Sequence, residues 1–174
     1  MMQSSPMNSN RAIILLGRLF FGAMFVYAAY SKLLHPTFIL HPWFALKFAV
    51  KANLANFAGE VETFKFLSAS SSGALAQVLP FVELSLGLLL LIGWRVRYWF
   101  AGVSLLLVVF LSVLTRAYVL HLDIKNCGCF ATPEPLTGMT LVRDGALLAA
   151  ALFCTYFAFV EARKPHPWTA TPSS

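Results

Sequence analysis

The chain has 174 residues, of which 59% are apolar and only 11% are charged. Soluble domains carry about 45–50% apolar and about 25% charged residues, so this composition excludes a disordered chain and a soluble globule. The net charge of +6 comes from scattered basic residues, mostly at the ends of apolar runs, which excludes a nucleic-acid-binding stripe and is typical of lipid anchoring. We therefore expect an integral membrane protein that forms one domain over residues 1–174 and contacts the lipid bilayer.

Four apolar segments are long enough to span a bilayer, which takes about 20 helical residues. The sequence predicts an all-α protein, a four-helix transmembrane bundle, with spans at about residues 12–34, 74–94, 98–120 and 139–160. Proline and glycine within the second span are compatible with this prediction, because neighbouring helices can cover the backbone groups that such residues free.

The first span carries two basic residues, Arg18 and Lys32, on one helical face. Each either pairs with an acid inside the bundle or extends its long side chain to the lipid headgroups. Gly22 lies on the same face and allows another helix to approach closely.

The connection between the first two spans, about residues 36–72, is too charged to cross the membrane and too apolar to lie free in water. The stretch from Trp43 to Leu67 mixes Phe and Leu with Lys and Glu, which favours an interfacial amphipathic helical segment. A lid that packs on the bundle is an equally open interpretation.

Glu83 is the deepest acid in the chain. A carboxylate in lipid is costly unless it is paired, so we expect Glu83 to face the bundle interior and to pair with Lys32 or Arg143. Arg143 and Asp144 open the fourth span. The sequence therefore predicts a polar cluster of Lys32, Glu83, Arg143 and Asp144 at one end of the bundle.

The loop at about residues 121–138 contains the sharpest motif of the chain, Cys127-Gly128-Cys129. Gly128 gives the backbone freedom to bring the two sulfurs together, and a disulfide across one residue is tight. Strained, exposed disulfides exchange readily, and Lys125 favours the thiolate that performs the exchange. Cys127 and Cys129 are therefore the candidate catalytic residues.

Three other interpretations of this cysteine pair stay open. It forms a static disulfide that pins the loop, two half-buried thiols, or part of a zinc site completed by at least two of His35, His41 and His121. We expect no metal. Cys154 lies in the middle of the fourth span, and we expect it to be a small core residue.

Basic residues are densest at the ends of the chain and in the tight turn between the second and third spans. By the excess of Lys and Arg in cytoplasmic loops, this pattern favours both termini in the cytoplasm of a bacterial cell, with the cysteine loop on the periplasmic side of the inner membrane. The residues concerned are Arg11, Arg95, Arg97, Arg163 and Lys164.

Four short motifs stand out along the chain and are Tyr30-Ser31-Lys32-Leu33, Pro80-Phe81-Val82-Glu83, residues 123–126 with Cys127-Gly128-Cys129-Phe130, and Arg143-Asp144. Through these motifs the chain resembles, over about residues 12–160, the MauE/DoxX family of redox-associated membrane proteins. The connection between the first two spans is longer and richer in Phe and Lys than the family pattern.

The resemblance implies a redox pair, Cys127 and Cys129, that exchanges disulfides with a periplasmic thioredoxin-like or client protein. It implies that the four residues of the polar cluster support this pair. It also implies no tightly bound cofactor and a membrane quinone as electron acceptor. The sequence leaves open whether the protein is an enzyme, a thiol–disulfide oxidoreductase, or a non-enzymatic accessory subunit of a larger membrane complex.

Overall fold

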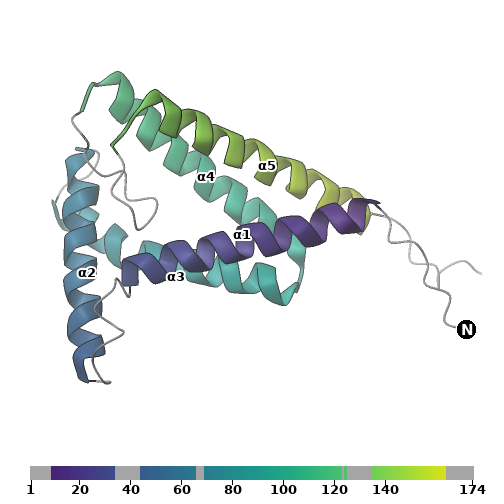
Figure 1. Cartoon of the computed structure of the whole chain (residues 1–174), viewed down its shortest axis with the longest axis horizontal. Helices are drawn as coiled ribbons and strands as arrows, with labels where there is room; N and C mark the ends of the chain where they lie inside the picture. Colours follow the sequence, from purple (N-terminus) through teal and green to yellow (C-terminus); the bar gives the residue numbers. More distant parts are fainter. Residues whose placement is uncertain (1–8, 34–43, 66–68, 123, 125–134, 164–174) are drawn as a thin grey trace, which may run out of the picture.

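A computed structural model of the chain describes residues 9–33, 44–65, 69–122, 124 and 135–163, without the side chains of residues 44–49, 69 and 70. Within these ranges the protein is all-α and contains no strand, which confirms the predicted fold class (Figure 1). The helices are α1 (Ser9–Leu33), α2 (Phe44–Thr63), α3 (Ala69–Ile92), α4 (Val96–Val119) and α5 (Gly138–Ala162).

Helices α1, α3, α4 and α5 are long and apolar enough to cross a membrane, which confirms the four predicted spans. α3 begins at Ala69, so residues 69–72 belong to its first turn and not to the connecting segment in which the sequence places them. Serine-rich stretches suit helix starts, because serine hydroxyls can bond the unpaired N–H groups there. Large apolar side chains such as Leu16 and Leu105 are exposed on the outer sides of the bundle, as lipid contact requires.

The four long helices pack as two pairs, with α1 on α3 and α4 on α5 (Figure 1). Gly22 and Gly87 bring α1 and α3 together, since a Cβ added at Gly87 would lie 2.9 Å from the Gly22 carbonyl oxygen. A hydrogen bond of 3.0 Å joins the Ser104 and Thr155 hydroxyls of α4 and α5. Because the Thr155 hydroxyl donates to the Ala151 carbonyl, Ser104 is the donor between the helices.

A core of large side chains joins the two pairs. Phe21 on α1 meets Phe100 on α4 edge to face, with ring centroids 6.3 Å apart. Cys154 is buried in the same core, and a Cβ added at Gly17 would lie only 2.6 Å from its Sγ. The prediction that Cys154 is a small core residue is therefore confirmed.

Arg18 binds the C-terminal end of α3. Its Nε donates to the Leu90 carbonyl at 2.9 Å and its Nη2 donates to the Leu91 carbonyl at 3.0 Å. The last carbonyls of a helix have no partner within the helix, and a cation there also interacts favourably with the helix dipole. Gly93 follows at a φ of 83°, and any side chain there would collide with the Arg18 guanidinium. Arg18 was expected to bind either an acidic side chain or the lipid headgroups. It binds backbone carbonyls of α3 instead.

Replacing Arg18 with methionine is expected to lower the free energy of unfolding by about 1–2 kcal/mol, because polar contacts between membrane helices contribute about that much. Unfolding of the purified variant by SDS in mixed micelles measures the change. Arg97→Met is the matched control, since the Arg97 guanidinium lies over the exposed ring of Tyr98 and its loss is expected to cost under about 0.5 kcal/mol. Equal costs for the two variants would contradict the helix-end role of Arg18.

Helix α2 lies across the end of the bundle at which α1 ends (Figure 1). One side of α2 packs against α1 and α3, which agrees with the interpretation of this segment as a lid. The other residues of the predicted segment, 36–43 and 66–68, lie outside the described part of the chain. The buried or half-buried apolar side chains of this side recur at helical spacing and are Val50, Leu54, Phe57 and Val61. Phe64, directly after the helix, belongs to a buried cluster with Leu114 and Ala117 of α4.

Candidate functional site

Lys32 and Glu83 form a buried ion pair between α1 and α3. The Lys32 Nζ donates to the Glu83 Oε1 at 2.6 Å, and the side chains are only 7% and 10% exposed. Lys32 lies in the last turn of α1, and Glu83 follows Pro80 by three residues in α3. Of the two partners predicted for Glu83, Lys32 is confirmed.

The side of this ion pair that faces away from the bundle is covered by α2. The Phe57 ring lies 5.0 Å from the Lys32 Nζ, within the range of a cation–π contact. Asn53 Nδ2 donates to the Leu33 carbonyl at 3.2 Å and so bonds the end of α1. The sequence did not single out either residue, although a phenylalanine at helical spacing within a charged segment was a signal for the packed side of α2.

Arg143 and Asp144 lie in the first turns of α5. Asp144 is 4% exposed, and the Arg143 Nε donates to its Oδ1 at 3.1 Å. The Arg143 side chain is only partly exposed, at 34%, and its Nη2 is buried, while Asp144 points inward. This arrangement lets the arginine balance the charge of a buried carboxylate.

A single cavity brings three of the four predicted polar residues together. Lys32 and Glu83 from one helix pair and Asp144 from the other line the same small space, and Arg143 bonds Asp144 from outside it. The cavity has a volume of about 60 Å³ and lies at the seam between the two helix pairs. Its other walls are apolar, which makes the three charged groups its chemically distinctive part.

Cys127 and Cys129 lie outside the described residues, but both ends of their loop are described. Ile124 is buried beside the end of α4, and its carbonyl accepts a hydrogen bond of 3.1 Å from the Leu136 N–H. Thr137 then caps α5. The two ends of the segment that carries the cysteines are therefore held together by the hydrogen bond between Ile124 and Leu136. This bond lies next to α5, the helix that bears Asp144.

The start of α5 is held by a reciprocal cap. The Thr137 Oγ1 accepts from the Thr140 N–H, and the Thr140 Oγ1 accepts from the Thr137 N–H, both at 3.4 Å. Replacing Thr137 with alanine is expected to cost about 1 kcal/mol and to speed amide hydrogen exchange in the first turn of α5. Thr115→Ala is the control, because the Thr115 hydroxyl donates to a carbonyl of its own helix and its loss should change little. Unchanged exchange in the first turn of α5 would show that the cap does not hold the loop.

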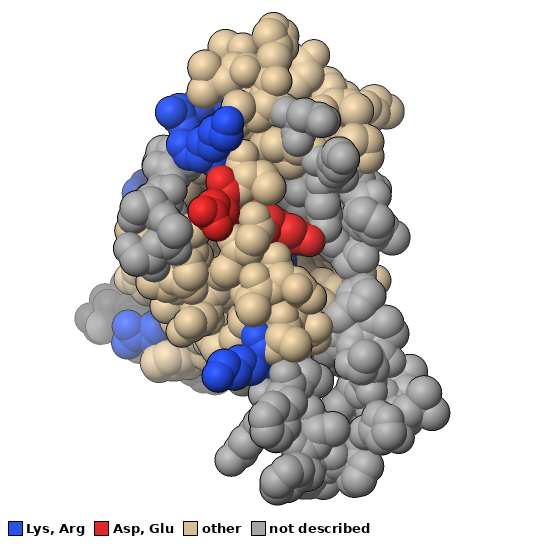
Figure 2. Space-filling model, turned by 90° about the vertical axis from the view of Figure 1, so that its left-hand side faces the viewer, with Lys and Arg blue, Asp and Glu red and all other residues tan. Residues whose placement is uncertain are grey.

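Basic and acidic side chains both reach the surface of the end of the molecule that carries α2 (Figure 2). Beneath this surface Lys32 and Glu83 are shielded. The surface at this end therefore carries both positive and negative charge and suits polar contacts. The Lys32–Glu83 pair, in contrast, is enclosed by the apolar helices.

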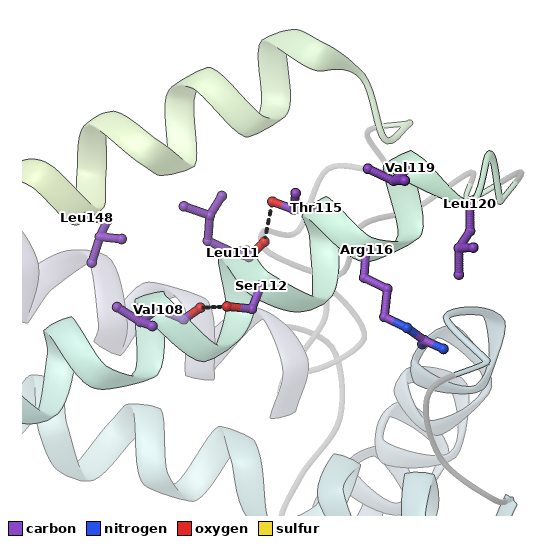
Figure 3. A pocket seen from close by; sticks show the side chains of 8 residues that line it. All are labelled: Val108, Leu111, Ser112, Thr115, Arg116, Val119, Leu120 and Leu148. Atoms are coloured by element: carbon purple, nitrogen blue, oxygen red, sulfur yellow. Dashed lines mark hydrogen bonds between the residues drawn. The ribbon is translucent and has the colours of Figure 1, made fainter.

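A larger hollow of about 630 Å³ lies on the outer side of α4 (Figure 3). Ser112 and Thr115 line it, but their hydroxyls donate to the carbonyls of Val108 and Leu111 in their own helix at 2.7 Å. Arg116 lies near one end of the hollow. Most of its lining is therefore apolar, as contact with lipid chains requires.

Comparison with known proteins adds one finding. The model of a family described as "Methylamine utilisation protein MauE" matches residues 10–157. The match includes all four long helices almost entirely, the polar cluster and the cysteine loop. No curated protein and no solved structure matches the chain.

Proposed function

Because the chain belongs to the MauE family of membrane proteins, we propose that it is a thiol–disulfide redox protein of the bacterial inner membrane. Cys127 and Cys129 form its exchangeable disulfide. Its partner is a periplasmic thioredoxin-like or client protein, and the description of the family links this protein itself to methylamine utilisation.

One observation carries this proposal: the closure of the cysteine loop at the charged end of the bundle. The hydrogen bond between Ile124 and Leu136 ties the loop to α4 and α5. Asp144 follows on α5 and lines the cavity that Lys32 and Glu83 also line. A loop anchored in this way can present its cysteines to a partner while its base stays packed in the membrane helices.

The proposed exchange is a two-electron reaction. A thiolate of the partner attacks one sulfur of the Cys127–Cys129 disulfide, and a mixed disulfide forms as the bond between the two cysteines breaks. The second thiolate of the partner then attacks the partner's own sulfur in the mixed disulfide, and the loop cysteine leaves as a thiolate. The partner leaves as a disulfide, the loop cysteines become two thiols, and two electrons have moved to this protein.

The loop cysteines must then be reoxidised. As acceptor we propose a membrane quinone, on the strength of the family resemblance. Two electrons and two protons from the Cys127 and Cys129 thiols convert the quinone into a quinol and restore the disulfide. No tightly bound cofactor is needed for this cycle.

The proposed orientation has both termini in the cytoplasm and the cysteine loop in the periplasm. Arg11, Arg95 and Arg97 lie at the same end of the bundle, where Arg11 bonds Glu161 near the end of α5. Cytoplasmic ends of membrane helices are enriched in such residues. The opposite end, with Lys32 and Glu83, then faces the periplasm.

A redox titration of the full-length protein in intact cells tests the proposal. A membrane-impermeant thiol reagent, applied over a dithiothreitol series, is expected to label Cys127 and Cys129 with a midpoint well above about −300 mV. Buried Cys154 serves as the internal control and is expected to stay unlabelled. Labelling only after lysis would contradict the proposed orientation.

A cysteine pair that stays oxidised to lower potentials would contradict the redox function. The pair would then be a structural disulfide, and the protein would be better explained as an accessory subunit of a larger membrane complex. That second function predicts that serine at both positions leaves the activity of the complex intact.

A further inference from the structure

Glu83 has a second carboxylate oxygen that the ion pair does not use. Oε1 accepts from Lys32, whereas Oε2 is buried and has no hydrogen-bond partner among the described residues. The whole residue is only 8% exposed. A buried acceptor without a donor costs about 1–3 kcal/mol, and more when it is charged, so this oxygen requires a donor that the side chains do not supply.

The cavity that Glu83 lines has room for such a donor. Its volume is about 60 Å³, and a cavity needs at least about 10–15 Å³ by the same measure to hold one water molecule. The space is therefore large enough for water. It is too small for an aromatic ring, since engineered cavities that bind benzene measure about 150 Å³.

The cavity also has the polar groups that a bound water needs. Buried waters make about three hydrogen bonds each. Glu83 Oε2 and the carboxylate of Asp144 are acceptors, and the Lys32 ammonium has three N–H donors, one of which points to Oε1. These groups come from α1, α3 and α5, so a water among them joins both helix pairs.

We propose that water occupies this cavity, donates a hydrogen bond to Glu83 Oε2 and bridges Glu83 to Asp144. The bridge makes the Lys32–Glu83 pair and Asp144 one hydrated polar site inside the membrane. Water is selected over other occupants because the site combines an acceptor that lacks a donor with a volume that is too small for an aromatic ring.

This site has a consequence for the cysteines, which rests on the proposed function. Oxidation of two thiols releases two protons at the loop between α4 and α5. The quinone takes up both protons in the proposed cycle, and a water that touches both carboxylates lets a proton pass between Asp144 and Glu83 on the way. The presence of the water does not depend on the cysteines, so the two ideas are tested separately.

X-ray radiolytic labelling of the full-length protein in lipid nanodiscs tests the water site. Radicals formed from a bound water react with adjacent side chains even where bulk solvent has no access. Phe25 lines the cavity and is 4% exposed, whereas Phe21 and Phe100 are 1% and 0% exposed in the core away from it. We expect Phe25 to be oxidised several-fold faster than Phe21 and Phe100, and equal slow rates for all three would overturn the proposal.

Two variants establish that Glu83 holds the water. Ala28 also lines the cavity, so Ala28→Val fills part of it and is expected to lower Phe25 oxidation to the Phe21 rate. The double variant Lys32→Met with Glu83→Leu removes the buried ion pair, leaves Asp144 paired with Arg143 and is expected to do the same. Undiminished Phe25 oxidation in both variants would mean that water enters from outside, which overturns the proposal.

A final variant separates this proposal from the proposed function. Cys127→Ser with Cys129→Ser is expected to leave the Phe25 rate unchanged, because no cysteine holds the water. Rapid Phe25 oxidation together with a non-exchanging cysteine pair would retain the water site and reject the redox function. Slow Phe25 oxidation together with an exchangeable cysteine pair would reject the water site and retain the redox function.

Discussion

Replacing Glu83 with leucine is expected to lower the free energy of unfolding by about 3–5 kcal/mol, which is the usual cost of removing one partner of a buried ion pair. The loss arises because the Lys32 ammonium loses the carboxylate oxygen 2.6 Å away and stays charged inside the bundle, where Asp144, which lines the same cavity, already balances Arg143. The Phe57 ring at 5.0 Å adds a cation–π contact, which is weaker than the lost ion pair. SDS unfolding of the purified protein in mixed micelles measures the change.

Two further variants show whether burial causes this effect. Arg11→Ala breaks the pair with Glu161, where the Arg11 side chain is 72% exposed, and is expected to cost at most about 1 kcal/mol. Lys32→Met combined with Glu83→Leu is expected to recover most of the stability, because no unpaired charge is left. A double variant as unstable as Glu83→Leu alone would show that Glu83 acts through contacts other than Lys32.

Replacing Gly87 with alanine is expected to cost about 3 kcal/mol, at the upper end of the range for overpacked sites. The new Cβ would lie 2.9 Å from the Gly22 carbonyl oxygen and 2.9 Å from the Val26 backbone nitrogen. Backbone atoms cannot move aside by a change of rotamer, so α1 and α3 must separate. The same SDS unfolding assay measures the loss.

Gly145→Ala is the matched control for Gly87. A Cβ at Gly145 meets no atom within 4 Å, and alanine favours a helix over glycine by about 1 kcal/mol, so this variant should be as stable as the wild type or more stable. Gly22→Ala should cost less than Gly87→Ala, because its nearest obstacle is the flexible Leu91 side chain. Equal stability of all three variants would mean that α1 and α3 do not depend on this close contact.

The sequence was sufficient to predict the buried ion pair, because an unpaired charge in lipid is costly. Glu83 is too short to reach the headgroups from its depth in the second span, so it required a basic partner, and Lys32 is that partner. The partners of Arg18 could not be predicted in the same way. Its partners are carbonyls at the end of α3, and which backbone groups lie near a side chain depends on helix packing, which the residue types do not specify.

The sequence by itself determined the number, length and order of the membrane helices, because a run of about 20 apolar residues is stable in lipid only as a helix. It also determined that a charged cluster would be buried. The tertiary structure alone decided that α2 covers the Lys32–Glu83 pair through Phe57, and that Asp144 lines the same cavity. Those placements depend on which apolar helix faces pack together. Lipid is as apolar as the helices, so it does not favour one arrangement of the helices over another, and the pattern of residue types therefore does not specify the packing.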